Sequence, residues 1–170
     1  VLPHMDPVYT ISIIPTGMGA AGYTMPLPDN DEMFNTKNKM LEDITTLLGG
    51  RVAEEIIFGD ITTGASNDIK RATETARSMV MKYGMSEKIG LIAYGNDDDE
   101  VFIGRDLAHT RGYSEEVARE IDGEISRIIR ECHENAESII RENIGVLHSC
   151  AALLLEKEKI HREEFEALFT

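Results

Sequence analysis

A chain of 170 residues is long enough for one domain with a sizeable core. Its 31 acidic residues exceed its 17 basic ones, and the net charge of -14 repels phosphates, which argues against DNA or RNA binding as a main function. Cys132 and Cys150 have no spacing typical of a disulfide framework or a four-cysteine zinc site, so we expect both to be reduced, as in an intracellular protein. No apolar run approaches the ~20 residues of a membrane helix.

The first 35 residues read as mixed strand and loop. Val8–Ile14 is rich in β-branched residues and ends at Pro15, which predicts a strand. The glycines of Gly17–Gly22 predict a flexible segment, and Tyr23–Pro28 then reads as a short extended segment whose prolines favour a sheet edge. A glycine-flanked edge strand can accept an extended peptide by strand addition; the alternative is a mobile loop.

Two amphipathic helices are predicted next. Lys37–Phe58 has apolar residues at helical spacing and is followed by Gly59. Gly49 and Gly50 lie inside it, each at a cost of about 1 kcal/mol relative to alanine, so we expect another element to approach their backbone closely. Asn67–Tyr83 is the second helix.

The rest of the chain is predicted to be mainly helical. A connector with a short strand at Val101–Gly104 precedes a long helix capped by Ser114, then helices at Leu147–Leu155 and His161–Phe169. The sequence therefore predicts a mainly α fold with a small β element near the N-terminus, in a single domain over residues 1–170. Its expected parts are 1–35 (mixed β and loop), 36–84 (active-site helices), 85–112 (connector) and 113–170 (C-terminal helices).

Asp68 is the first candidate for chemistry because it opens the second helix. An acid in the first turn is stabilised by free amides and by the helix dipole, so a purely structural acid is one interpretation. Ser66 or Asn67 can already supply the cap, however, and the small residues Gly64 and Ala65 leave space beside the carboxylate. A ligand site is the second interpretation.

Glu54 and Glu55 are the second candidate because both lie at or within the apolar stripe of the first helix. Burying an unpaired carboxylate is costly, so each needs a partner. Arg51 can pair with Glu55 one turn on; a metal, or a histidine bound to a metal, is the alternative. The five histidines show no metal-ligand spacing, and His133 is expected to be solvated or to pack; no His-Glu-x-x-His or phosphate-loop motif occurs in these residues.

Several motifs together resemble a known family. They are Ile11–Gly17 (ISIIPTG), Gly22–Pro28 (GYTMPLP), Leu48–Gly59 (LGGRVAEEIIFG), Thr62–Thr73 (TTGASNDIKRAT) and Gly84–Gly90 (GMSEKIG). In this order and spacing they closely resemble the protease domain of the FtsH family, ATP-dependent zinc metalloproteases anchored in membranes. The resemblance extends from near Val1 to near Phe169.

The resemblance implies a role for three places in this chain. In the family, zinc is held by the two histidines of a His-Glu-x-x-His helix and a third, acidic ligand, and the glutamate between the histidines is the general base. That motif normally lies just upstream of the position matching Val1, so no catalytic residue is expected in this chain. By resemblance, Asp68 is the metal ligand, Glu54 is the acid near the ligating histidines, and Gly22, Tyr23 and Thr24 form the edge strand that binds substrate.

The family also implies the setting of the whole protein. We expect polypeptide substrates, including unfolded or membrane proteins, and a homo-hexamer anchored by transmembrane helices upstream. ATP and magnesium would bind only in an upstream ATPase module, with this domain on the cytoplasmic side of a bacterial inner membrane or its organellar equivalent. The 170 residues alone are expected to be inactive. The alternative is a catalytically inactive, acidic helical module for assembly or interaction.

Overall fold

The computed structural model describes residues 1–15, 22–28, 33–94 and 112–169. The chain divides into two compact units, one made of Thr36–Ala136 and the other of Val1–Asn35 with Glu137–Thr170. Each unit has its own buried core. The predicted strand at 101–104, and most of the predicted flexible segment at 17–22, lie outside the described residues. A single domain over the whole chain stays a prediction.

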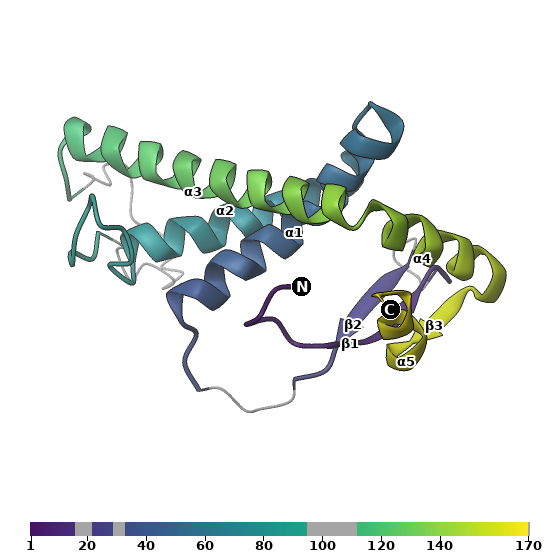
Figure 1. Cartoon of the computed structure of the whole chain (residues 1–170). Helices are drawn as coiled ribbons and strands as arrows, with labels where there is room; N and C mark the ends of the chain where they lie inside the picture. Colours follow the sequence, from purple (N-terminus) through teal and green to yellow (C-terminus); the bar gives the residue numbers. More distant parts are fainter. Residues whose placement is uncertain (16–21, 29–32, 95–111, 170) are drawn as a thin grey trace, which may run out of the picture. The chain divides into compact units, whose positions relative to one another are not determined.

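The described part of the first unit is built on three helices (Figure 1). Helix α1 covers Lys37–Phe58, as predicted; the Thr36 hydroxyl accepts from the Lys39 amide (3.2 Å), and Gly59 ends the helix at a φ of 62°. A 3-10 turn, η1 (Thr63–Ala65), leads into α2 (Ser66–Met81). Helix α3 covers Glu115–Glu142 and continues into the other unit.

Apolar faces of all three helices form the core of this unit. Small residues on α2 let the helices approach, because Ala72 and Ala76 are fully buried. The remaining core includes Met40, Ile44 and Leu48 of α1, Met79 and Val80 of α2, and Ile121, Ile125, Ile128 and Cys132 of α3. The predicted helical spacing is therefore the packing pattern of the unit.

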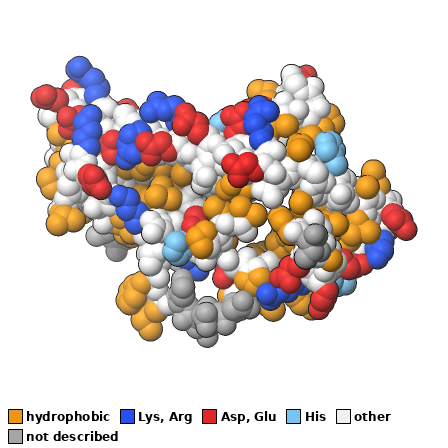
Figure 2. Space-filling model, viewed as in Figure 1, with side chains coloured by type: hydrophobic (Ala, Val, Ile, Leu, Met, Phe, Trp, Pro, Cys, Tyr) orange, Lys and Arg blue, Asp and Glu red, His pale blue; other side chains and the backbone are white. Residues whose placement is uncertain are grey.

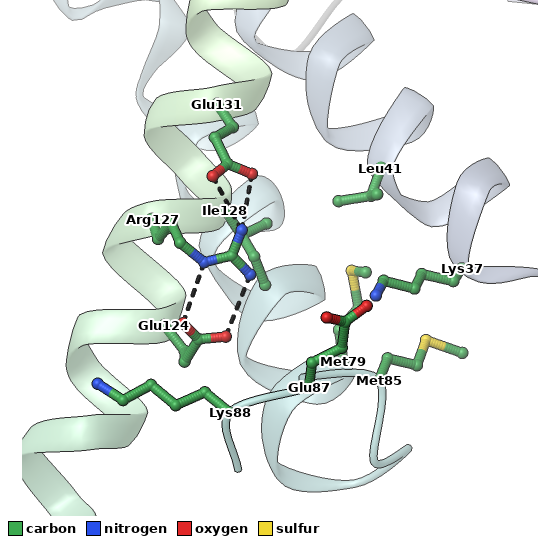
Figure 3. Close-up of a pocket in the computed structure, with 10 residues that line it drawn as sticks. All are labelled: Lys37, Leu41, Met79, Met85, Glu87, Lys88, Glu124, Arg127, Ile128 and Glu131. Atoms are coloured by element: carbon green, nitrogen blue, oxygen red, sulfur yellow. Dashed lines mark hydrogen bonds and ion pairs between the residues drawn. The ribbon is translucent and has the colours of Figure 1, made fainter. Parts of the chain in front are cut away.

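One buried carboxylate joins α3 to the segment that follows α2. Glu124 is 7% exposed, and it accepts two hydrogen bonds from Arg127 (3.0 and 3.1 Å) and one from the Ser86 hydroxyl (2.6 Å). Arg127 also donates to Glu131, so its guanidinium lies between two carboxylates (Figure 3). The hydrogen bonds from Arg127 and then Ser86 outweigh burial and hold the pKa of Glu124 below its ordinary value.

The second unit contains an antiparallel sheet with strand order β2-β1-β3. Strand β1 covers Val8–Ser12 and β2 covers Tyr23–Pro26, both within the predicted extended segments. Strand β3 (Lys159–His161) was not predicted, because three residues between helices give no alternating pattern. Because β1 is the middle strand, β2 is an edge strand, as its prolines indicated.

Helices α4 (Ile144–Lys157) and α5 (Arg162–Glu166) and the 3-10 turn η2 (Ala167–Phe169) complete this unit. Cys150 and Leu154 of α4 pack with Ile160 of β3 to form its core, and both cysteines of the chain are buried and free. The predicted last helix is thus divided into a short α-helix and a 3-10 turn.

Charged residues cover the exposed surface of α3. Figure 2 shows acidic and basic side chains interleaved along this helix, which is typical of a solvated helix face. Among the described residues, no single helix is both long and apolar enough to span a membrane; α3 and α4 meet that criterion only as a bent pair, and only by length and composition.

Gly50→Ala is expected to stabilise the 170-residue chain by about 0.5–1 kcal/mol, because no described residue lies within 4 Å of a Cβ built at Gly49 or Gly50. The expected close approach to these glycines is therefore not made by any described element. Urea unfolding measures the effect. As a control, Gly22→Ala should destabilise, because its Cβ would overlap the Ser12 carbonyl oxygen. A loss of stability in Gly50→Ala would contradict the prediction.

Glu124→Gln is expected to destabilise the chain by about 1–3 kcal/mol at neutral pH, because a buried charged hydrogen-bond acceptor is lost. The folded-state pKa of Glu124 is lowered, so its carboxylate stabilises the fold above the unfolded-state pKa, and this contribution is lost as the pH falls. The difference between wild type and variant should therefore shrink below about pH 4. Urea unfolding across pH 3 to 7 tests this; a difference independent of pH would contradict it.

Candidate functional site

Asp68 lies in the first turn of α2, three positions after the N-cap residue Ala65. Its side chain is 45% exposed, and its Oδ1 lies 3.9 Å from Nη1 of Arg71, one turn further along the same helix. An ion pair of that length between exposed groups contributes little. The carboxylate is therefore half exposed, held on a regular helix, and open to a stronger partner.

The predicted cap of this helix is wrong. Helix α2 begins at Ser66 itself, so neither Ser66 nor Asn67 precedes it, and Ala65 at the N-cap makes no side-chain hydrogen bond. The capping interaction lies one turn earlier, where the Thr62 hydroxyl accepts from the Gly64 amide (3.1 Å) and starts η1. The start of α2 is consequently fixed by the loop before it.

Glu54 lies near the end of α1 and binds this loop. Its Oε1 accepts from the Thr62 hydroxyl (2.6 Å), and its Oε2 accepts from the Thr62 amide (3.2 Å). These two hydrogen bonds, with a smaller effect of the Arg51 charge, hold the pKa of Glu54 below its ordinary value. The carboxylate is thus charged at neutral pH and already has a partner within the chain.

Arg51 does not make the expected ion pair with Glu55. Instead its Nη2 donates to the Thr62 carbonyl (2.9 Å), while its Nη1 lies 3.7 Å from Oε2 of Glu54. Glu55 turns to α3, where its Oε2 lies 3.2 Å from Nε2 of His133. Arg51 and Glu54 are three residues apart and therefore lie on the same side of α1, and both contact the loop at Thr62 on that side.

The donors for a metal are incomplete in the described part of the chain. No group of three or more histidine, cysteine, aspartate or glutamate side chains is gathered there in a way that could hold an ion. Asp68 fits as a single oxygen ligand, because its carboxylate is accessible and its ion pair with Arg71, at 3.9 Å, is the only one found for it among the described residues. Glu54 fits less well as a direct ligand, because both of its oxygens accept hydrogen bonds from Thr62.

Gly22, Tyr23 and Thr24 belong to the other compact unit, at the exposed edge strand β2. The Leu27 amide donates to the Pro7 carbonyl (3.1 Å), so Leu27 faces β1. Because facing alternates along an antiparallel strand, the N–H and C=O of Thr24 point to the free edge. A peptide can pair with that edge.

A separate pocket of about 380 Å³ lies in the three-helix unit, lined by apolar and charged side chains (Figure 3). Leu41, Met79 and Ile128 supply apolar surface to the pocket, and Arg127 contributes a guanidinium group to its lining. Because Arg127 already lies between Glu124 and Glu131, the pocket offers no free guanidinium for an anion. None of the predicted site residues lines it.

Sequence reasoning missed Arg51 and Thr62 as parts of this arrangement. The spacing of Arg51 and Glu54 permits an ion pair, but nothing in it indicates a loop residue eight positions beyond Glu54 as the shared partner. In the sequence, Thr62 is only the first residue of the Thr62–Thr73 motif, and no pattern marks it as a hydrogen-bonding partner of α1.

The sequence matches the model of peptidase family M41 over residues 1–168. It is 55% identical to "ATP-dependent zinc metalloprotease FtsH 1" of Thermoanaerobacter sp. over 99% of this chain and 27% of that protein. It is 54% identical to "ATP-dependent zinc metalloprotease FtsH" of Caldicellulosiruptor bescii over 98% of this chain and 27% of that protein. The protein of that name in Thermotoga maritima is 48% identical over 100% of this chain and 28% of its own length.

The chain therefore spans only about a quarter of the length of these relatives. The family match nevertheless covers nearly all of its residues, and it agrees with the resemblance seen in the sequence motifs and with the mainly helical fold. This chain belongs to peptidase family M41.

Proposed function

We propose that this chain is the peptidase part of a zinc-dependent endopeptidase and that Asp68 is the carboxylate ligand of its zinc. The observation that carries the proposal is the state of Asp68: half exposed, in the first turn of a regular helix, and paired only weakly with Arg71. The relatives at 48–55% identity are named zinc metalloproteases, and these names support zinc as the metal.

A short acid at a helix start suits this role for two reasons. The first turn is rigid, because its backbone is fixed by the helix, and its free amides and dipole stabilise the negative charge of Asp68. When bound, zinc with three protein ligands supplies an acidified water as the nucleophile for peptide hydrolysis. Asp68 would contribute one of those ligands, and we propose that two histidines outside these 170 residues contribute the others. No general base is proposed within the chain.

Strand β2 is proposed to hold the substrate. Thr24 offers its N–H and C=O at the free edge of the sheet, and a polypeptide in extended form can pair with them as an added strand. Backbone pairing of this kind is independent of sequence, so it suits an enzyme that degrades many polypeptides. Specificity would then come from side-chain contacts next to the edge.

For the whole protein we propose the activity stated in the names of the relatives, ATP-dependent proteolysis. Unfolded or membrane proteins as substrates, a homo-hexamer, an ATPase module that binds ATP and magnesium, and a membrane anchor with this part on the cytoplasmic or equivalent organellar side are carried over from the FtsH resemblance. The competing proposal, an inactive acidic module for assembly, differs in having no zinc.

Asp68→Ala is expected to weaken zinc binding by at least 10-fold and to abolish casein cleavage, because the site loses its oxygen ligand. The protein for this test is a chimera in which the chain replaces the matching segment of the Thermotoga maritima relative. Zinc affinity is measured by competition with a chromogenic chelator, and cleavage with unfolded casein. Asp60→Ala, an exposed acid in the same loop region, serves as the control.

A chimera that binds no zinc would support the inactive assembly module. An Asp68→Ala chimera that binds zinc as tightly as the unsubstituted chimera would contradict the ligand assignment. The 170-residue chain alone should leave casein intact in the presence of zinc, and zinc-dependent cleavage by that chain would refute the proposal that the other ligands lie outside it.

Thr24→Pro in the chimera is expected to raise KM for casein about 3- to 10-fold, because proline removes the N–H at the free edge while leaving the pairing with β1 intact. Zinc affinity should not change. Thr24→Val keeps the N–H and is the matched control. If Thr24→Pro and Thr24→Val have equal KM values, substrate does not pair with this edge.

A further inference from the structure

We propose that Arg51 and Thr62 are positioning residues for Asp68. With Glu54 they form a clamp, defined here as the hydrogen-bonded contact of Arg51 and Glu54 with Thr62, which fixes the loop from which α2 starts. The inference rests on the proposed function, because it concerns the placement of the proposed zinc ligand.

The clamp uses every polar group of Thr62. Its carbonyl accepts from Arg51 (2.9 Å), its amide donates to Glu54 (3.2 Å), and its hydroxyl also donates to Glu54 (2.6 Å). The same hydroxyl accepts from the Gly64 amide (3.1 Å). A loop residue held at its amide, carbonyl and side chain is restricted in rotation, and two of its three binding partners come from α1.

The position of Thr62 determines where α2 begins. Its hydroxyl starts the 3-10 turn Thr63–Ala65, which runs directly into Ser66 and the first turn containing Asp68. Helix α2 has no side-chain cap of its own at Ala65. Because the backbone is helical or 3-10 from Thr63 onward, a shift at Thr62 is transmitted to the Asp68 carboxylate.

Electrostatics favour a clamp that stays closed. The Arg51 side chain is only 13% exposed and that of Glu54 22%, so either charge left alone would be costly. Nη1 of Arg51 is buried without a hydrogen bond to any described residue, and it lies 3.7 Å from Oε2 of Glu54. The guanidinium of Arg51 is therefore held between Thr62 and Glu54.

Gly64 leaves little room for a side chain next to the clamp. A Cβ at this position would lie 3.2 Å from Oγ1 of Thr62 and 3.7 Å from Oε1 of Glu54, so any side chain there would press on the clamp. The clamp is thus closely packed on the loop side, although the loop itself is exposed.

The proposal differs from a merely structural role in what it predicts for zinc. If the clamp only joined α1 to α2, its loss would lower the free energy of unfolding and leave the metal site unchanged. If it positions Asp68, its loss weakens zinc binding even where the protein remains folded, as loss of supporting hydrogen bonds does at metal sites generally.

Thr62→Val in the Thermotoga maritima chimera is expected to weaken zinc binding about 10- to 100-fold, because valine has a similar shape but cannot bond Glu54 or Gly64 through a hydroxyl. Thr62→Ser retains the hydroxyl and should bind zinc within about 3-fold of the unsubstituted chimera. The zinc dissociation constant is measured by chelator competition at a temperature where circular dichroism shows all variants folded. Cobalt in place of zinc adds a visible spectrum that reports the ligand geometry.

Two further variants separate the outcomes. Glu124→Gln lowers stability elsewhere in the same unit and should leave zinc affinity unchanged; an equal loss of affinity there would overturn the clamp as a specific device. If Thr62→Val does not fold, Arg51→Lys replaces it, since lysine keeps the charge but lacks the guanidinium fork, and the same weakening is expected.

Asp68→Ala distinguishes failure of this inference from failure of the proposed function. If Asp68→Ala weakens zinc binding and Thr62→Val does not, the clamp is structural and the inference is wrong, while the ligand assignment stands. If Asp68→Ala itself has no effect, the proposed function fails and the inference fails with it.

Discussion

The contact of two α1 side chains with Thr62 connects the main structural features of the three-helix unit. It holds the end of one helix against the start of the next, through a loop that has no apolar anchor other than Ala65. Burial of alanines along α2 allows the two helices to pack closely, but residues 59–64 of the loop between them are exposed, so core packing does not restrict the loop directly. Directional hydrogen bonds from charged groups restrict the loop instead, and they are the stronger class of hydrogen bond.

The two acids that the sequence singled out have different environments. Glu54 has both oxygens bonded to Thr62, and those bonds lower its pKa. Among the described residues, Asp68 has only a weak pair with Arg71. In physical terms, the first acid is engaged in shaping the fold, while the second is available to an external cation. This division gives a reason why one chain carries both acids close to the same loop.

Family membership and local geometry support the proposal in different ways. The match to peptidase family M41 and the 48–55% identity to proteins named zinc metalloproteases establish the relationship, but this chain covers only about a quarter of their length. The local geometry indicates which carboxylate can still accept a metal. An accessible acid on a rigid element, supported by a hydrogen-bonded loop, is the arrangement that a preorganised metal ligand requires.

The sequence alone determined the elements whose periodicity extends over several turns. Lys37–Phe58 was predicted to the residue from its helical apolar spacing and from Gly59, which ends it, and Asp68 could be placed in the first turn of the following helix. The tertiary structure alone decided which partners the polar residues take. Arg51 contacts Thr62 and Glu54 and not Glu55. Strand β3 forms because its backbone pairs with β1. The physical reason is range: helical periodicity is a property of neighbours along the chain, whereas the partner of a polar side chain depends on which distant backbone groups folding brings within about 3 Å.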